Sequence, residues 1–292
     1  MNKSFESLTL MDDFVFGQVL MDEELCKKLL ETILNVKIRK LDYIKAQESF
    51  IPPIFDAKSI RLDVYVEDDQ NTIYDLDVQT TDKKNLGKRL RFYQSLMDVR
   101  ALEKGADYKN LKKSFVIFIC NYDPFGSEKY MYTFHNYCTE DQTIMLDDDA
   151  TKIIINSKGT KGAIRDDLKA VLQYLEDGVI SSDYTKALDA AVISLKADEK
   201  VRRAYMIYEQ SLADREELGK KIGKEIGKEI GQHMKDVRLV RENMETRSIE
   251  SLSSLFLISV ADCEKVIAAI QAHPDWNDEQ IALDVQWDDQ QG

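Results

Sequence analysis

The feature that most limits what this chain can fold into is a pair of short segments in which apolar and polar residues alternate. Residues 60–66 read IRLDVYV and residues 72–79 read TIYDLDVQ, with five polar residues between them. Such alternation is typical of β-strands that bury one face, and a short polar turn joins two such strands into a hairpin. Residues 86–101 have the apolar spacing of an amphipathic helix, and residues 114–120 (SFVIFIC) that of a buried strand. Two strands, a helix and a third strand predict an α/β core.

Further elements are predicted before and after this core. Helices are expected at 11–20, where Asp12 or Asp13 can act as the cap, and at 22–35, where Asp22 can do so. Pro52 and Pro53 interrupt the chain before the hairpin. Further strands are predicted at 129–137, 142–146 and 151–156, and further helices at 162–175 and 182–211. The core region is therefore expected to extend to about residue 190.

An internal repeat follows, in which glycine recurs every fourth residue from Gly219 to Gly231. Each glycine costs a helix about 1 kcal/mol relative to alanine, so four in one helix favour a close approach to a partner helix. This interpretation predicts a homodimer formed through the repeat, whereas a charged, semi-flexible linker explains the same pattern without a partner. Two short helices are predicted within 248–271, with a turn at 257–259. We therefore expect three parts: a domain at 1–190, a helical arm at 191–247 and a small acidic two-helix segment at 248–292.

Charge and composition narrow the classes of function. No apolar run is long enough to cross a bilayer, and the first residues lack the apolar region of a secretory signal, so we expect a cytoplasmic protein without a membrane partner. The four cysteines form no CxxC pair and the three histidines do not cluster, so no structural zinc site is indicated. The formal net charge of -13 argues against nucleic acid as a partner. Charge is segregated, however: the balance is +6 over 81–113 and -8 over 248–292.

Two aspartates and a glutamine lie on the predicted hairpin. Asp77 and Gln79 are two residues apart and share one face of their strand, and pairing across the short turn can bring Asp63 beside Asp77. Apolar neighbours flank both carboxylates, which would repel one another unless a divalent cation such as Mg²⁺ or Mn²⁺ neutralised them. The alternative is that both aspartates face solvent on an edge hairpin.

These residues, together with the basic helix that follows, resemble the PD-(D/E)XK nuclease superfamily. More narrowly, the segments IRLDVYVED, IYDLDVQ, KRLRFYQSLMD and FVIFICNYDPFG resemble the recombination-promoting nuclease/putative transposase family. The resemblance runs from about Asp13 to Gly126 and continues in the glycine repeat and the C-terminal helices. It implies a mixed β-sheet flanked by helices, with a restriction-endonuclease-like core and an α-helical C-terminal extension. It also implies Mg²⁺-dependent hydrolysis of phosphodiester bonds in DNA.

The resemblance also assigns roles to individual residues. Asp63 and Asp77 would bind the metal ion, Arg89 would hold the scissile phosphate and Tyr93 would orient it, although Tyr93 is equally explained by core packing. Gln79 stands in place of the superfamily's lysine and lacks its positive charge, although this family commonly carries glutamine there. Asp77 stands where the longer glutamate is more usual. Neither departure excludes nuclease activity.

Asp13 is a candidate third metal ligand under the same resemblance, and helix capping is the alternative for it. The basic residues after the hairpin are candidates for DNA contact, and a solvated helix face is the alternative for them. The NYDPFG segment is interpreted as a structural turn, because Asp123 before Pro124 suits turn geometry. The candidate DNA-binding residues are Lys83, Lys84, Lys88, Arg89 and Arg91.

The function expected from these features is a metal-dependent DNA endonuclease associated with recombination or transposition. No serine, cysteine or histidine arrangement predicts a covalent intermediate. The alternative is a catalytically degenerate nuclease fold that binds DNA or protein. A purely oligomeric scaffold would explain the glycine repeat but would leave the paired aspartates without a role.

Overall fold

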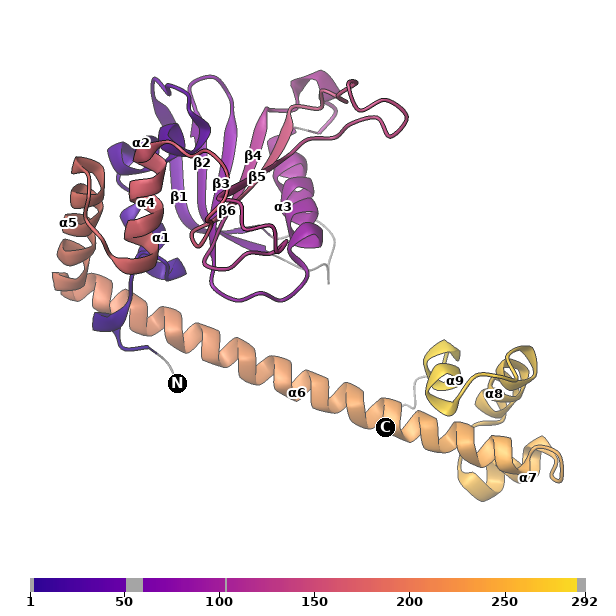
Figure 1. Ribbon diagram of the computed structural model, residues 1–292. Helices are drawn as coiled ribbons and strands as arrows, with labels where there is room; N and C mark the ends of the chain where they lie inside the picture. The colour runs from indigo at the N-terminus through magenta and orange to yellow at the C-terminus, as the bar shows by residue number, and fades with distance from the viewer. Residues whose placement is uncertain (1–2, 51–59, 103, 288–292) are drawn as a thin grey trace. The chain divides into compact units, whose positions relative to one another are not determined.

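The computed structural model describes residues 3–50, 60–102 and 104–287 (Figure 1). The chain divides into two compact units, Met1–Tyr205 and Met206–Gly292. The boundary lies inside one long helix, α6 (Glu199–Asn243). The predicted α/β class with a helical C-terminal extension is confirmed, whereas the finer division at residues 190 and 247 stays a prediction.

A mixed sheet forms the centre of the first unit. In the described residues it has the strand order β1-β2-β3-β4-β6-β5. Strands β1, β2 and β3 pair antiparallel, β3, β4 and β6 pair parallel, and β5 pairs antiparallel with β6. The strands are β1 (Leu41–Phe50), β2 (Ile60–Asp68), β3 (Ile73–Gln79), β4 (Ser114–Cys120), β5 (Met131–Phe134) and β6 (Ala150–Asn156).

Helices lie on both faces of this sheet (Figure 1). Helix α3 (Leu86–Ala101) connects the parallel strands β3 and β4, which need a crossover. Its apolar residues, among them Leu90 and Met97, pack against Val116 and Phe118 of β4. The helices on the side of the sheet away from α3 are α1 (Asp13–Val19), α2 (Glu23–Leu34), α4 (Asp166–Asp177) and α5 (Asp183–Ala197). Because both faces are covered, every residue of β3 is buried, including its polar ones.

Most predicted elements of the first unit are confirmed. The hairpin, α1, α2, α3, β4, β6 and α4 lie where the sequence patterns place them, and Asp22 caps α2 by accepting a hydrogen bond from the backbone N of Leu25 (3.0 Å). The expected strand at 142–146 is wrong, because the described chain makes only an isolated bridge there, between Tyr137 and Met145. The expected helix at 182–211 is two helices, since Asp198 is extended and ends α5. Strand β1 was not predicted. Pro52 and Pro53 lie outside the described residues.

The second unit is a small helical domain built on the end of α6. Helices α7 (Ile249–Phe256), α8 (Val260–Ala272) and α9 (Asp278–Asp284) surround a core that includes Val237 and Val240 of α6. The predicted turn between the first two helices is confirmed, with Ser259 Oγ accepting a hydrogen bond from the backbone N of Asp262 (2.9 Å). Helix α9 was not predicted, so the expected two-helix segment contains three. None of the helices in the described ranges is long and apolar enough to span a membrane.

Candidate active site

Asp63 and Asp77 lie where the ladder between β2 and β3 ends. The paired residues run from Glu67 and Ile73 to Val64 and Leu76, and Asp63 and Asp77 come next on the two strands. The backbone N of Asp63 donates to Oδ1 of Asp77 (2.9 Å), and the backbone N of Val78 donates to Oδ2 of Asp63 (3.0 Å). Each carboxylate thus satisfies a peptide group of the opposite strand. The side chains hold the two strands at a fixed separation and place the two carboxylates together.

Both aspartates are shielded from water. Asp63 is 7% exposed and Asp77 is 1% exposed. Burial raises the pKa of Asp77 to about 6, although the hydrogen bond from the backbone of Asp63 and the charge of Arg89 both act to lower it. The raised pKa means that the ionised form of Asp77 is incompletely compensated by its protein neighbours.

Gln79, Arg89 and Tyr93 form a chain of polar contacts that begins at Asp77. Nε2 of Gln79 donates to Oδ2 of Asp77 (3.4 Å), and Nη1 of Arg89 donates to Oε1 of Gln79. Nη2 of Arg89 donates to the hydroxyl of Tyr93 (2.8 Å) and lies 3.7 Å from Oδ2 of Asp77. An amide can donate to a carboxylate and accept from a guanidinium at the same time, which a lysine cannot do. The glutamine therefore places the positive charge of Arg89 beside the aspartates.

Helix α3 supplies this charge because Arg89 and Tyr93 are four residues apart and lie on one face of it. Tyr93 also packs edge-on against Phe118, with ring centroids 5.2 Å apart. Tyr93 is thus both a core residue and a polar partner, so the two interpretations of it are compatible. Burial raises the pKa of its hydroxyl, which stays protonated at neutral pH.

Asp75 is a buried acid that the sequence interpretation missed. It is fully buried, and neither carboxylate oxygen has a hydrogen-bond partner among the described residues. Burial and the charges of Asp77 and Asp63 raise its pKa well above the ordinary value. The signal was present in the sequence, because Asp75, Asp77 and Gln79 alternate on β3 and therefore share a face.

The donor set fits a divalent cation that keeps part of its water shell. Among the described residues, no three histidine, cysteine, aspartate or glutamate side chains converge as metal ligands. Mg²⁺ commonly binds through one or two carboxylates and several waters, which matches Asp63 and Asp77. The unpartnered oxygens of Asp75 and the raised pKa of Asp77 both suit a site that binds a cation.

Asp13 lies near these residues, on helix α1. It is the first residue of α1, and its Oδ1 accepts a hydrogen bond from the backbone N of Phe14 (2.7 Å). Its charge acts on Asp77, where it raises the pKa. The structure thus brings Asp63, Asp77, Gln79, Arg89 and Tyr93 into one connected group, with Asp13 at its margin.

The comparison with protein families agrees with this geometry. A model described as PD-(D/E)XK nuclease family transposase matches residues 10–172, more than half of the chain. The chain belongs to this family. Neither a curated protein nor a solved structure matches it significantly. The matched region of the PD-(D/E)XK nuclease family transposases includes every residue of the group described above, so the resemblance identified from the sequence is confirmed.

The candidate DNA-binding side chains of this family member separate into two sets. Arg89 points inward to Gln79, whereas Lys83, Lys84, Lys88 and Arg91 are exposed. Lys84 makes an ion pair with Asp82 (2.5 Å). Lys88 and Arg91 lie on the amino-terminal half of α3, which also carries Arg89, and Lys83 and Lys84 directly precede that helix.

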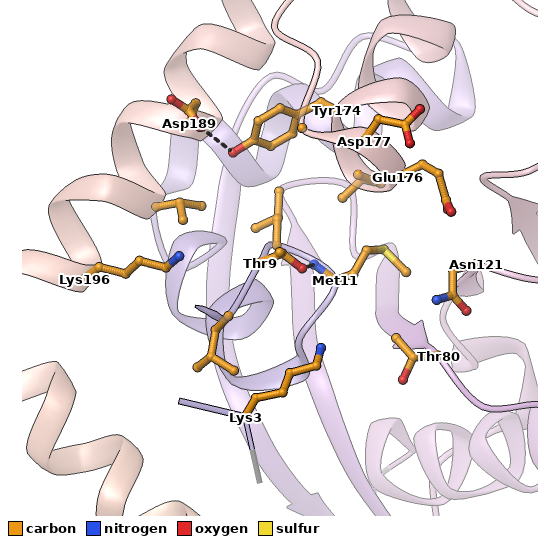
Figure 2. A pocket seen from close by; sticks show the side chains of 15 residues that line it. Lys3, Thr9, Met11, Thr80, Asn121, Tyr174, Glu176, Asp177, Asp189 and Lys196 are labelled. Carbon is orange, nitrogen blue, oxygen red and sulfur yellow. Dashed lines mark hydrogen bonds between the residues drawn. The ribbon is translucent and has the colours of Figure 1, made fainter. Parts of the chain in front are cut away.

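A pocket of about 470 Å³ lies beside the ends of β3 and β4, where Thr80 and Asn121 line it (Figure 2). Its charged lining is mixed, because Lys3 and Lys196 share it with Glu176, Asp177 and Asp189. An excess of acids does not suit phosphate. Asp63, Asp77, Gln79, Arg89 and Tyr93 are not among the described residues that line this pocket.

A stability measurement tests the electrostatics of Asp75. Because its pKa is raised in the folded protein, its contribution to stability is complete below pH 4 and is lost as the pH rises through the folded pKa. Asp75→Asn cannot ionise, so it is expected to raise the melting temperature at pH 8 by about 5 °C and to leave it nearly unchanged at pH 4. Calorimetry in EDTA at both pH values checks this, with the exposed Asp177→Asn as control. A loss of stability at pH 8 would contradict it.

Proposed function

We propose that this protein is a metal-dependent endonuclease that hydrolyses phosphodiester bonds in DNA, with a role in recombination or transposition. The observation that carries the proposal is the pair of buried, facing carboxylates of Asp63 and Asp77, joined through Gln79 to Arg89. Two desolvated acids beside a fixed guanidinium suit a reaction in which a metal ion and a phosphate must be held together.

Asp63 and Asp77 would hold the ion, Mg²⁺ or Mn²⁺, and Asp13 is the candidate third ligand on the side of α1. When bound, such an ion polarises a phosphoryl oxygen and lowers the pKa of a coordinated water. The carboxylates are preorganised for this because backbone N–H groups fix one oxygen of each. Ligands held in place before binding lose little conformational entropy on binding.

Arg89 is the residue we assign to the scissile phosphate. Its planar guanidinium can donate to phosphate oxygens in a forked geometry, and its contacts with Gln79 and Tyr93 fix its orientation. Gln79 would position Arg89 and would not itself contact the phosphate. Arg89 would supply the positive charge that the glutamine lacks.

DNA is the substrate that the local charge favours, despite the acidic chain as a whole. The exposed cations around the start of α3 can contact phosphates on either side of the cleaved bond, a sequence-independent mode of binding. These cations are Lys83, Lys84, Lys88 and Arg91. Lys88 and Arg91 lie on the helix that carries Arg89, and Lys83 and Lys84 directly precede it, so these cations would align the backbone of the DNA with the aspartates.

The test of the proposed function is cleavage of supercoiled plasmid by the purified full-length chain. Conversion to nicked or linear DNA in Mg²⁺ or Mn²⁺, and its loss in EDTA, is the expected result. Metal-dependent binding without conversion of any plasmid form would favour the degenerate fold instead. Gln79 and Asp77 are the departures from the superfamily pattern that would explain such an outcome.

The homodimer is a separate part of the proposal and rests on the surface of α6. Leu218, Ile222 and Ile226 are 56%, 46% and 49% exposed, so this apolar stripe has no cover within the described chain. A Cβ added at any of the adjacent glycines would meet no described atom within 4 Å. These glycines are Gly219, Gly223, Gly227 and Gly231. Apolar residues beside glycines suit a close contact with the same helix of a second copy.

Sedimentation velocity tests the dimer. Leucine at both Gly223 and Gly227 is expected to weaken self-association at least about tenfold by steric clash, whereas alanine at both positions should be tolerated and should favour the helix. A wild-type chain that stays monomeric at micromolar concentration, or equal self-association of the leucine and alanine variants, would contradict this part of the proposal.

A further inference from the structure

An exposed aromatic cluster lies beyond the end of β4. Phe125 and Phe134 are 47% and 41% exposed, and both rings contact one another, with centroids 5.5 Å apart. Phe125 also packs edge-on against Tyr132, with centroids 4.8 Å apart. Large apolar side chains gathered at a surface in this way commonly mark an interaction site.

The loop that carries Phe125 is rigidly built. Oδ1 of Asp123 accepts hydrogen bonds from the backbone N of Phe125 (3.0 Å) and from the hydroxyl of Tyr132 (2.8 Å). Its Oδ2 accepts from the backbone N of Glu128 (2.5 Å). Tyr132 itself packs against the core beneath α3. The exposed ring of Phe125 is therefore fixed before any ligand arrives, which lowers the entropy cost of binding.

The cluster lies on the same face of the sheet as the aspartates. Across the sheet Asp77 faces Phe118, Phe118 faces Ile154, and Ile154 faces Tyr132. Three strand spacings separate Asp77 from Tyr132, or about 14 Å at about 4.8 Å each. That distance corresponds to about four nucleotides at the rise of one DNA strand, about 3.4 Å.

Tyr122 is a further aromatic residue of this region, two residues beyond the end of β4. It packs against the same core beneath α3, and burial raises the pKa of its hydroxyl, on which the charges of Asp82 and Arg89 also act. Asp82 directly precedes Lys83 and Lys84, which are exposed. Tyr132 of the cluster, Tyr122, and Tyr93 of the active-site group all pack in one core.

The acids of the loop are already neutralised within it. The carboxylate of Asp123 accepts the three hydrogen bonds described above, which lower its pKa against the effect of burial. Glu128 makes an ion pair with Lys161 (3.1 Å) and accepts a hydrogen bond from Oγ1 of Thr160 (3.2 Å). These contacts offset the charges of Asp123 and Glu128 within the loop.

We infer that Phe125, with Phe134 beside it, is a stacking platform for unpaired bases, and that the substrate is DNA with a single-stranded segment next to the cleaved bond. Every base has a π-face, so aromatic rings beside a basic surface bind single strands with little sequence preference. Paired bases keep their faces stacked in the duplex and cannot use such a platform. The inference deepens the proposed function and rests on it for the position of the cleaved bond.

The experiment measures binding of oligonucleotides to the full-length chain by fluorescence anisotropy in Ca²⁺. Phe125→Ala is expected to raise the Kd for a single strand about tenfold and to leave the Kd for a blunt duplex unchanged. Phe125→Trp, which keeps a stacking ring, should restore single-strand binding. The matched control is Tyr108→Ala, which removes an aromatic ring that is 81% exposed elsewhere on the unit. Lys88→Gln should weaken binding to both DNA forms, because phosphates are common to them.

The outcomes separate this inference from the proposed function. The inference is wrong if Phe125→Ala and Tyr108→Ala bind a single strand with equal affinity, which is also the result expected if Phe125 binds a protein partner instead. It is equally wrong if the wild type binds no single strand, even if plasmid is cleaved. Loss of single-strand binding in Phe125→Ala alone supports it even if no DNA is cut. As a readout that needs no variant, the fluorescence of 2-aminopurine in a bound single strand should fall on stacking.

Discussion

Replacing Asp77 with asparagine is expected to lower the rate of plasmid cleavage at least about a thousandfold, and Asp63→Asn to do the same, because either change removes a charge that would bind the metal ion. Asparagine keeps an oxygen that can accept the hydrogen bond from the opposite strand, so the geometry between β2 and β3 should persist. The measurement is the initial rate of nicking in Mg²⁺, with circular dichroism to show that the variants are folded.

The hairpin offers a matched control for this test. Asp68 lies on the same strand as Asp63, is also 7% exposed, and accepts hydrogen bonds from the backbone N of Thr72 (2.9 Å) and the hydroxyl of Tyr74 (2.6 Å). Asp68→Asn is expected to reduce stability without reducing the rate per folded molecule. Cleavage at the wild-type rate by both Asp63→Asn and Asp77→Asn would show that these residues are not part of the active site.

The second large effect is expected from Arg89. Arg89→Met should lower the cleavage rate about a hundredfold and destabilise the fold by about 2 kcal/mol, because Gln79, Tyr93 and Asp77 all lose their contact with the guanidinium. Arg91→Met, on the same helix but exposed, is the control and should affect mainly the salt dependence of DNA binding.

The pH dependence of Arg89→Met gives an independent readout. The charge of Arg89 lowers the pKa of Asp77, which burial raises to about 6, so its removal should raise that pKa further. Asp77 must be ionised to bind a cation, so the acidic limb of the pH–rate profile should lie near pH 6 in the wild type and move to higher pH in the variant. An acidic limb that does not move, or that moves to lower pH, would show that Arg89 does not act on Asp77.

The strongest local patterns of this chain were sufficient to predict its central elements. The alternation in the hairpin and the apolar stripe of α3 gave their positions, and the shared face of Asp77 and Gln79 followed from the period of a strand. Strand β1 could not be found in this way. In the described part of the chain it is an edge strand, and its sequence, LDYIKAQESF, lacks regular alternation. The segment 142–146 has the composition of a strand, but among the described residues it pairs only at Met145. Pairing depends on a neighbouring strand, which a local pattern does not encode.

The hydrogen bonds within the active site also could not be predicted from the sequence. That each aspartate accepts a hydrogen bond from the opposite strand depends on the register at which the ladder ends. The contact between Arg89 and Gln79 depends on how α3 packs across the sheet. Asp75 could have been noted as a third acid on the same face, but its lack of partners is a property of the packed core alone.

The most direct test of this account is the position of Mn²⁺ in a crystal of the protein soaked with that ion, located by anomalous scattering. The account predicts one peak between the carboxylates of Asp63 and Asp77, absent from crystals of Asp77→Asn soaked in the same way. An ordered site without a peak at saturating Mn²⁺, or a peak that persists in Asp77→Asn, would contradict a metal-dependent active site at this pair.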